Sequence, residues 1–243
     1  MKKRKAALIL CAAAALSLAA CGSQEAGGQA PSSQTQTGGS GEADGTDTAG
    51  SGSTPVSGGR ILIAYFSVPE TDGVDTEASA SRVSADGEVM GNNEYIARLI
   101  QQETGGDLFA IETVQEYPGT HDDLLDFAYN EMLDDARPEL ASQIEDPGSY
   151  DTIFLGYPNW NSDLPMPLYT FLEEYDFSGK TIIPFTTHGG SGFSRTIQTI
   201  EDMQPDASVV EDGLSISRND VADAQGDVTD WIAELGLAAE KML

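Results

Sequence analysis

Cysteine is nearly absent from this chain of 243 residues, which contains only Cys11 and Cys21. Two thiols exclude a disulfide framework and a multi-thiolate metal site. Basic residues are scarce as well, with 12 Lys and Arg against 40 Asp and Glu and a formal charge of −28. Four of the twelve lie at positions 2–5, and without them the balance is −32. Phosphate backbones and anionic bilayers repel such a chain, which excludes nucleic-acid binding.

The first twenty residues have the pattern of an export signal. A basic start is followed by an apolar run, residues 6–20, that is too short to span a bilayer as a permanent helix. Leu18-Ala19-Ala20-Cys21 resembles the bacterial lipobox, so we expect cleavage before Cys21 and lipidation of Cys21. An ordinary secretory peptide with an incidental cysteine is the alternative. Removal of Cys11 with the signal would leave no free thiol for redox chemistry.

Residues 21–59 contain almost nothing apolar. They consist mainly of Gly, Ser, Thr and Gln, a composition that does not offset the entropy of ordering the backbone. We predict a disordered stalk over 21–59, which holds a folded domain, residues 60–243, on the outer face of the cytoplasmic membrane.

Three continuous apolar runs predict strands that are covered on both faces by helices. They are Ile61–Phe66, Thr152–Gly156 and Thr181–Thr186, although Pro184 removes a ladder donor from the third. Weaker strand candidates are Leu108–Glu112 and Ser208–Ile216.

Helical periods lie between these strands. Apolar residues recur at helical spacing in five sets, which are Ile96, Leu99 and Ile100; Leu125, Ala128, Tyr129 and Met132; Leu168, Phe171 and Leu172; Phe193, Ile197 and Ile200; and Val228, Trp231, Ile232 and Leu235. Gly226 or Asp227 is the expected cap of the last helix. Five strands, each followed by a helix, predict an α/β fold with a doubly wound parallel sheet.

Ligands of such sheets bind outside the carboxyl ends of the strands. Three strand exits carry polar or glycine-rich sequences: 67–73 after the first strand, 157–163 after the third and 187–192 after the fourth. Hydroxyls, glycines and amides there suit an anionic ligand or one with many hydrogen-bonding groups.

With these motifs the chain resembles the bacterial flavodoxin family. The matching sequences are Tyr65-Phe66-Ser67, Gly156-Tyr157-Pro158-Asn159-Trp160, Leu164-Pro165-Met166-Pro167 and Thr187-His188-Gly189-Gly190-Ser191-Gly192. The resemblance implies a flavodoxin-like three-layer sandwich with five parallel strands in the order 2-1-3-4-5. It also implies noncovalent FMN, with the phosphate in the first loop and the isoalloxazine ring between the other two.

The resemblance and the residue types together define the candidate cofactor-binding residues. They are Ser67, Thr71, Gly91, Asn92, Asn93, Tyr157, Pro158, Asn159, Trp160, Thr187, His188, Gly189, Gly190, Ser191 and Gly192.

The phosphate has no obvious basic partner in this acidic sequence. We therefore expect backbone N–H groups, hydroxyls and a helix N-terminus to bind it, with Gly91-Asn92-Asn93 opening the first helix. Residues 69–90 form an insertion relative to the short first loop of flavodoxins. Asn93 stands where the family often has Thr, and Ser67 or Thr71 is expected to compensate. A surface loop with an Asn helix cap is the alternative.

Aromatic and histidine side chains have two interpretations each. Trp160 either stacks on the flavin or packs beneath its loop as a core aromatic, and Tyr157 belongs equally to the site or the core. His188 either donates a proton to the flavin or a substrate, or is structural. His121, before Asp122 and Asp123, is expected to be a capping or surface residue.

Acidic pairs invite a metal-site interpretation, which their spacing contradicts. The pairs are Asp122-Asp123, Asp134-Asp135 and Glu173-Glu174. Neighbouring residues on a helix point in different directions, and no His lies at ligand spacing. We expect solvated surfaces and no metal.

The sequence therefore predicts an exported, lipid-anchored, FMN-binding electron-transfer protein with a basic redox partner. Two alternatives stay open. One is an FMN-dependent reductase of quinones or small aromatic molecules, and the other is a flavin-free binding or scaffold lipoprotein on the same fold.

Overall fold

The computed structural model describes residues 59–71, 82–85 and 87–239. The predicted signal peptide, the lipidation site Cys21 and the stalk lie outside the described residues, as does part of the predicted insertion. None of the helices in the described ranges is long and apolar enough to cross a membrane.

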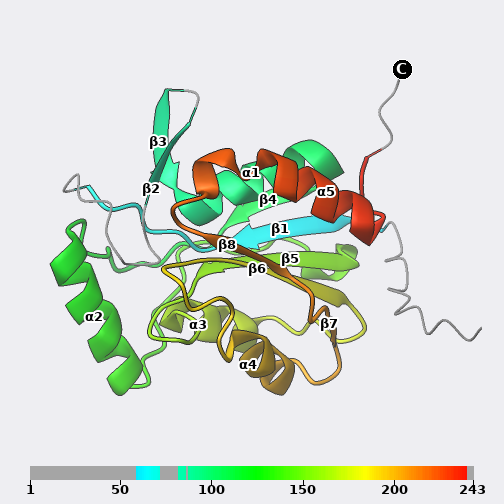
Figure 1. The fold of residues 1–243 in the computed structure, drawn as a ribbon. Coiled ribbons are helices and arrows are strands. Elements are labelled where there is room, and N and C mark those ends of the chain that lie inside the picture. The colour runs from blue at the N-terminus through cyan, green and yellow to red at the C-terminus, as the bar shows by residue number, and fades with distance from the viewer. Residues whose placement is uncertain (1–58, 72–81, 86, 240–243) are drawn as a thin grey trace, which may run out of the picture. The chain divides into compact units, whose positions relative to one another are not determined.

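A parallel sheet forms the centre of the domain (Figure 1). Its strands are β1 (Ile61–Tyr65), β4 (Asp107–Ala110), β5 (Thr152–Pro158), β6 (Thr181–His188), β7 (Ser208–Val209) and β8 (Leu214–Ser217). The order is β4-β1-β5-β6-β7, with β8 also paired to β6. The sheet therefore has the order 2-1-3-4-5, and the predicted flavodoxin-like α/β class is confirmed.

Helices cover both faces of this sheet. The helices of the described residues are α1 (Asn92–Thr104), α2 (His121–Leu133), α3 (Met166–Glu174), α4 (Thr196–Met203) and α5 (Gln225–Leu235), with 3₁₀ turns η1 (Pro147–Ser149) and η2 (Val221–Asp223). Figure 1 shows α1 and α5 on one face, and α3 and α4 on the other.

Neighbouring residues of the central strands belong to different core clusters. Leu62 and Ala64 pack in the cluster that includes α3, whereas Ile63 packs against α1 and α5. The alternation has the same form in β5, where Phe154 lies on the α1 side. Since successive side chains of a strand point to opposite faces, a strand buried on both faces has the continuous apolar run seen in the sequence.

The fifth strand position is split in two. β7 pairs with Thr181 and Ile182 of β6, and β8 pairs with Phe185–His188. Pro184 lies between the two paired stretches. Val210 N donates to Ile182 O on this side of β6, and alternation along the strand directs the nitrogen of residue 184 to the same side. The missing ladder donor therefore falls in the gap, which explains a proline in a buried strand.

Two short strands outside this sheet form an antiparallel hairpin, β2 (Arg82–Ala85) with β3 (Glu88–Gly91). The hairpin lies within the predicted insertion and leads directly into α1 (Figure 1).

Several element boundaries differ from the sequence expectations. β4 ends at Ala110, α4 begins at Thr196, after Phe193, and the predicted strand 208–216 is the split pair β7 and β8. The expected cap of the last helix is also wrong, because α5 begins at Gln225 with Ala224 as its N-cap.

Candidate functional site

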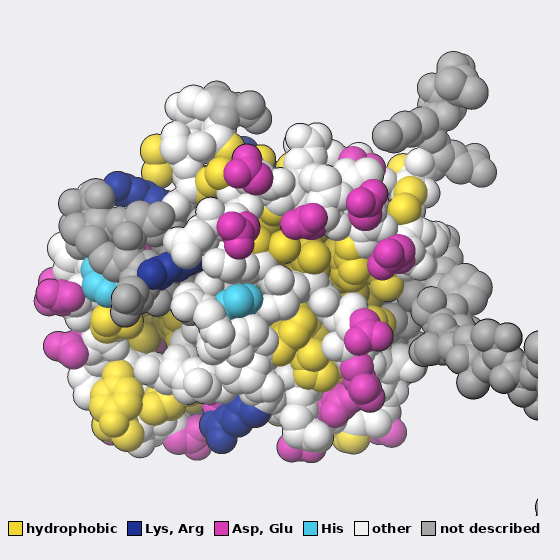
Figure 2. Space-filling model, in the orientation of Figure 1, with side chains coloured by type: hydrophobic (Ala, Val, Ile, Leu, Met, Phe, Trp, Pro, Cys, Tyr) yellow, Lys and Arg dark blue, Asp and Glu magenta, His cyan; other side chains and the backbone are white. Residues whose placement is uncertain are grey.

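Three loops meet at the carboxyl edge of the sheet, after β1, β5 and β6. Figure 2 shows the molecule in the orientation of Figure 1, in which β1 runs across the view, and His and Lys or Arg side chains lie among scattered acidic ones on the face that is shown. The meeting of the loops is fixed by specific hydrogen bonds.

The first loop runs against the start of α1. Gly91 is the N-cap of this helix, with φ −71° and ψ 148°, and Asn92 and Asn93 are its first residues. A Cβ atom at position 91 would lie 2.0 Å from Ser67 Oγ. Glycine therefore lets the Ser67 hydroxyl sit beside the helix N-terminus, where the first N–H groups have no acceptor within the helix.

Asn92 and Asn93 are buried, each about 1% exposed. Asn93 Nδ2 donates to Thr187 Oγ1 at 2.9 Å, which links the start of α1 to the end of β6. Within the described residues, Asn93 Oδ1 is a buried acceptor with no hydrogen-bond partner. This polar atom and the space reserved by Gly91 are features that fit a polar group bound beside α1.

Thr71, the other predicted hydroxyl of the first loop, is engaged elsewhere. Its N–H and its Oγ1 both donate to Gly119 O, at 2.7 and 3.0 Å. The structure therefore ties Thr71 to the segment that precedes α2, whereas Ser67 lies at the helix N-terminus.

The loop after β5 is a miniature hairpin. Trp160 and Asp163 form an antiparallel bridge, and the two residues between them, Asn161 and Ser162, have φ values of 53° and 65°. Positive φ at both central positions defines the type I′ turn that suits a two-residue hairpin. The turn fixes where Trp160 lies relative to the strand end.

Trp160 is 8% exposed and packs against other aromatic rings, edge-on against Phe66 and tilted against Tyr117. Its ring centroid lies 5.5 Å from that of Phe66, at 83°, and 5.7 Å from that of Tyr117. The indole thus belongs to the aromatic cluster beneath the loop after β5. Through Phe66 it also lies beside the start of the loop after β1.

Tyr157 belongs to the core. It is fully buried, and its hydroxyl donates to Thr196 Oγ1 at 2.9 Å. Burial raises the pKa of Tyr157 well above its ordinary value. Pro158, the last residue of β5, is buried beside it.

The second and third loops are joined by two polar side chains. Asn159 Nδ2 donates to Gly192 O at 2.6 Å and to Ser194 Oγ at 3.2 Å, and Asn159 N donates to Thr187 O. Asp163 is buried and accepts hydrogen bonds from Leu164 N, Tyr169 Oη, Thr199 Oγ1 and Arg195 Nη2. The motif had indicated Asn159, whereas Asp163 and Arg195 were missed.

The third loop presents its backbone to the outside. Gly189, Gly190 and Ser191 are exposed, and Gly190 and Gly192 have φ values of 125° and 58°. Residues that carry a Cβ atom rarely adopt these conformations, whereas glycine does so without steric cost. The loop can therefore bring amide groups close to a flat ligand.

His188 lies at the start of this loop and is partly buried. Gly190 N donates to His188 Nδ1 at 2.9 Å, and burial lowers the pKa of the imidazole below its ordinary value. Because Nδ1 accepts, the neutral ring carries its proton on Nε2. His188 is thus a neutral donor at the strand edge.

Two sequence expectations about charged residues are wrong. His121 is not a surface residue: its side chain is 13% exposed, and its Nδ1 lies 3.0 Å from Oε1 of the fully buried Glu70. The first loop also has a basic neighbour, because Arg82 Nη1 donates to Glu70 O at 2.9 Å. Sequence spacing gave no sign of the contact between His121 and Glu70.

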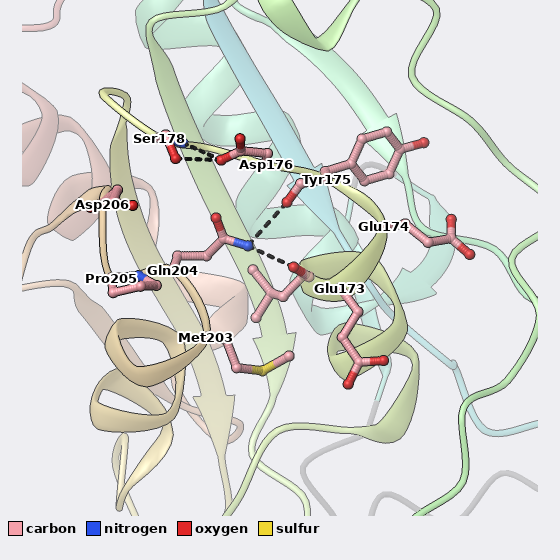
Figure 3. A pocket seen from close by; sticks show the side chains of 10 residues that line it. Glu173, Glu174, Tyr175, Asp176, Ser178, Met203, Gln204, Pro205 and Asp206 are labelled. Atoms are coloured by element: carbon pink, nitrogen blue, oxygen red, sulfur yellow. Dashed lines mark hydrogen bonds between the residues drawn. The ribbon is translucent and has the colours of Figure 1, made fainter.

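A pocket of about 600 Å³ lies at the opposite edge of the sheet and is a weaker candidate for a ligand site. It lies between the ends of α3 and α4, where Gln204 Nε2 donates to the carbonyls of Leu172 and Tyr175 (Figure 3). Its lining includes Glu173, Glu174, Asp176 and Asp206. Such a lining repels an anionic ligand, and the pocket is far from the carboxyl ends at which ligands of this fold bind.

Metal binding finds no support in the described part of the chain, which holds no cluster of three or more His, Cys, Asp or Glu arranged around a possible ion. The acidic pairs of the sequence are exposed, in agreement with the expected solvated surfaces.

The comparisons with known proteins agree with the fold. A family model described as flavodoxin matches residues 83–235. The chain belongs to the flavodoxin family. No curated protein matches this flavodoxin-family chain.

Solved structures resemble this family member along most of their length. A proposed flavoprotein from Bacteroides uniformis is 28% identical, with a TM-score of 0.56 over 72% of this chain and 99% of its own. A proposed flavoprotein from Bacteroides eggerthii is 26% identical, with a TM-score of 0.55 over 73% of this chain and 98% of its own. A flavoprotein in complex with FMN from Lactobacillus acidophilus is 18% identical, with a TM-score of 0.48 over 71% and 98%.

Proposed function

We propose that this flavodoxin-family protein binds FMN and transfers electrons as an exported, lipid-anchored carrier. The observation that carries the proposal is the joining of the three loops at one sheet edge. Asn93 links the start of α1 to β6, and Asn159 links the loop after β5 to the glycine-rich loop after β6. Membership of the flavodoxin family supports FMN as the ligand of this edge.

The phosphate of FMN fits the first loop. The Ser67 hydroxyl and the N–H groups of Gly91, Asn92 and Asn93 would hold it, since helix N-termini favour anions. Riboflavin, which lacks the phosphate, is then expected to bind much more weakly than FMN.

The flavin ring fits between the second and third loops. Trp160 would contact the ring, and the backbone N–H groups of Gly189, Ser191 and Gly192 would donate to its polar atoms, since that of Gly190 is bonded to His188 Nδ1. When bound, FMN supplies reversible one- and two-electron transfer. The protein orients the ring, excludes water and sets the surrounding charge.

The net charge supports the proposed partner, and the N-terminal sequence supports the proposed location. A formal charge of −28 favours a basic redox partner, whose association slows as salt rises. The lipobox-like Leu18–Cys21 sequence supports the proposed location on the outer face of the cytoplasmic membrane, with lipid on Cys21.

One observation favours a second candidate function, an FMN-dependent reductase of quinones or small aromatic molecules. His188 is held as a neutral Nε2–H donor at the same sheet edge, which suits proton delivery during a two-electron reduction. A spectroelectrochemical titration separates the two candidates. Two resolved one-electron steps favour the carrier, and a single two-electron step favours the reductase.

The test of the proposal is an absorption spectrum of the purified protein before and after addition of FMN and removal of the excess by desalting. Flavin bands retained at about one equivalent per chain are expected. A colourless protein that binds no FMN contradicts the proposal and indicates a flavin-free binding protein on this fold. Free tryptophan mixed with FMN serves as the blank for unspecific stacking.

A further inference from the structure

The hairpin before α1 brings a basic residue to the helix N-terminus. In the antiparallel pairing of β2 with β3, Arg82 lies directly opposite Gly91, the N-cap of α1. Directly opposed residues have Cα atoms about 4.5 to 5.5 Å apart, and their side chains leave the same face of the ladder. The backbone of Arg82 therefore lies next to the N-cap residue of α1.

The shared face of this pair points at the loop after β1. A Cβ atom at position 91 would point to Ser67 Oγ, at 2.0 Å, and to Pro69 Cδ, at 3.6 Å. The Arg82 side chain follows the same direction, because its Nη1 donates to Glu70 O at 2.9 Å. The guanidinium is thus fixed to the loop whose Ser67 lies beside the helix N-terminus.

Within the described residues no carboxylate pairs with Arg82, in contrast to four other arginines. Carboxylates pair with Arg60, Arg98, Arg137 and Arg195. Among the described residues, the contact of Arg82 is with a neutral carbonyl oxygen. One of its five N–H donors makes that contact, and a guanidinium offers the rest in a planar fork that matches phosphate oxygens.

We propose that Arg82 is a phosphate-binding residue of the cofactor site, acting with the Ser67 hydroxyl and the first N–H groups of α1. The inference rests on the proposed FMN function and adds a cation to a phosphate site otherwise made of neutral groups. It also gives the hairpin inserted before α1 a role, because the hairpin register carries Arg82 to the cap. The Glu70 carbonyl orients the guanidinium.

The experiment compares Arg82→Gln with Arg98→Gln, which removes the same charge from the outer side of α1, where Arg98 pairs with Glu88 and Glu94. Dissociation constants of FMN and of riboflavin are measured for both variants by quenching of flavin fluorescence. Arg82→Gln is expected to weaken FMN about tenfold to 100-fold, the usual loss of a hydrogen bond to a charged group. Riboflavin affinity is expected to stay within about twofold, and Arg98→Gln to change neither.

A second readout follows the phosphate itself. The ³¹P resonance of bound FMN is expected to shift between the wild type and Arg82→Gln and to stay in place in Arg98→Gln. Arg82→Lys keeps the positive charge but lacks the planar pair of N–H donors of the guanidinium. Its FMN affinity is therefore expected to lie between those of the wild type and Arg82→Gln. Unchanged circular dichroism and thermal unfolding show that the variants are folded.

Three results would overturn the role of Arg82. They are equal weakening of FMN and riboflavin by Arg82→Gln, equal weakening of FMN by both arginine variants, and an FMN affinity of Arg82→Gln equal to that of the wild type. Each leaves the proposed FMN function standing. If the wild type binds neither flavin, the proposed function fails, and Arg82 is then tested by titrating the protein into inorganic phosphate and following the ³¹P signal. Broadening of this signal by the wild type and by Arg98→Gln, but not by Arg82→Gln, supports an anion site at Arg82. No broadening by the wild type rules that site out.

Discussion

Replacing Gly91 by alanine is expected to separate cofactor affinity from fold stability. The new Cβ atom would lie 2.0 Å from Ser67 Oγ. To reach an ordinary contact of about 3.5 Å, the hydroxyl has to move by about 1.5 Å. Serine achieves this by turning to another staggered rotamer, which takes its oxygen away from the N-terminus of α1.

The fold tolerates the methyl group if Ser67 Cβ, which would lie 3.0 Å from the new Cβ atom, shifts by a few tenths of an ångström. The backbone at Gly91, with φ −71° and ψ 148°, lies in a region open to every L-residue. Alanine in a compatible conformation gains about 0.4 to 1 kcal/mol by restricting the unfolded chain, which offsets part of the strain at Ser67. The free energy of unfolding is therefore expected to change by less than about 1 kcal/mol.

Cofactor affinity responds more strongly. Loss of a hydroxyl hydrogen bond to a charged phosphate amounts to about 1.5 to 3 kcal/mol, which is about a 10- to 150-fold weaker FMN complex. Fluorescence titration with FMN and riboflavin measures this, and riboflavin affinity is expected to be unchanged.

The matched control is Ser67→Ala, which removes the hydroxyl without adding a methyl group at position 91. If Gly91→Ala acts by displacing that hydroxyl, the double variant binds FMN no more weakly than Ser67→Ala alone. The assignment of the phosphate to the N-terminus of α1 beside Ser67 would be refuted by a Gly91→Ala variant with the FMN affinity of the wild type. It would also be refuted if the losses of FMN binding free energy of the two single variants added fully in the double variant.

Four further outcomes are expected. Trp160→Ala weakens FMN by about 1 to 3 kcal/mol in a fluorescence titration, by analogy with bases stacked on aromatic rings; an unchanged affinity and flavin spectrum remove Trp160 from the site. Burial raises the pKa of Glu131, which accepts hydrogen bonds from Tyr117 and Gln115. Its contribution to stability is complete below its ordinary pKa and is lost as pH rises through the raised folded pKa. In thermal unfolding from pH 4 to 8, the wild type is therefore expected to lose stability relative to Glu131→Gln. A difference between the two proteins that does not depend on pH contradicts this. Cys21→Ser releases the protein from membranes, and mass spectrometry of the wild type finds lipid on Cys21; a membrane-bound Cys21→Ser protein counts against the anchor. Electron transfer to a basic acceptor such as cytochrome c slows as salt rises, and a salt-independent rate removes the charge argument.

The central sheet was predictable because its strands are buried on both faces. Ile61–Phe66, Thr152–Gly156 and Thr181–Thr186 have continuous apolar runs for that reason, and each coincides with a strand, β1, β5 or β6. The carboxyl ends of parallel strands share one edge, so the sequence alone groups the motifs that follow these strands.

The contacts at that edge were less predictable because they join residues far apart in the chain. Nothing local pairs Glu70 with His121, or Asp163 with Arg195. One local signal was available and overlooked: Asp86-Gly87 is a strong two-residue hairpin sequence, and it lies between β2 and β3. Reading it would have placed Arg82 opposite Gly91.

The side chains that join the second and third loops also have a kinetic consequence. Asn159 and Asp163 hold these loops together through groups of the protein itself. Little conformational entropy is then left to lose when a ligand arrives, so association is limited by encounter and not by loop rearrangement. For a dianion approaching a chain of formal charge −28, encounter is slowed by repulsion. Salt is therefore expected to accelerate FMN capture while it slows the meeting with a basic partner.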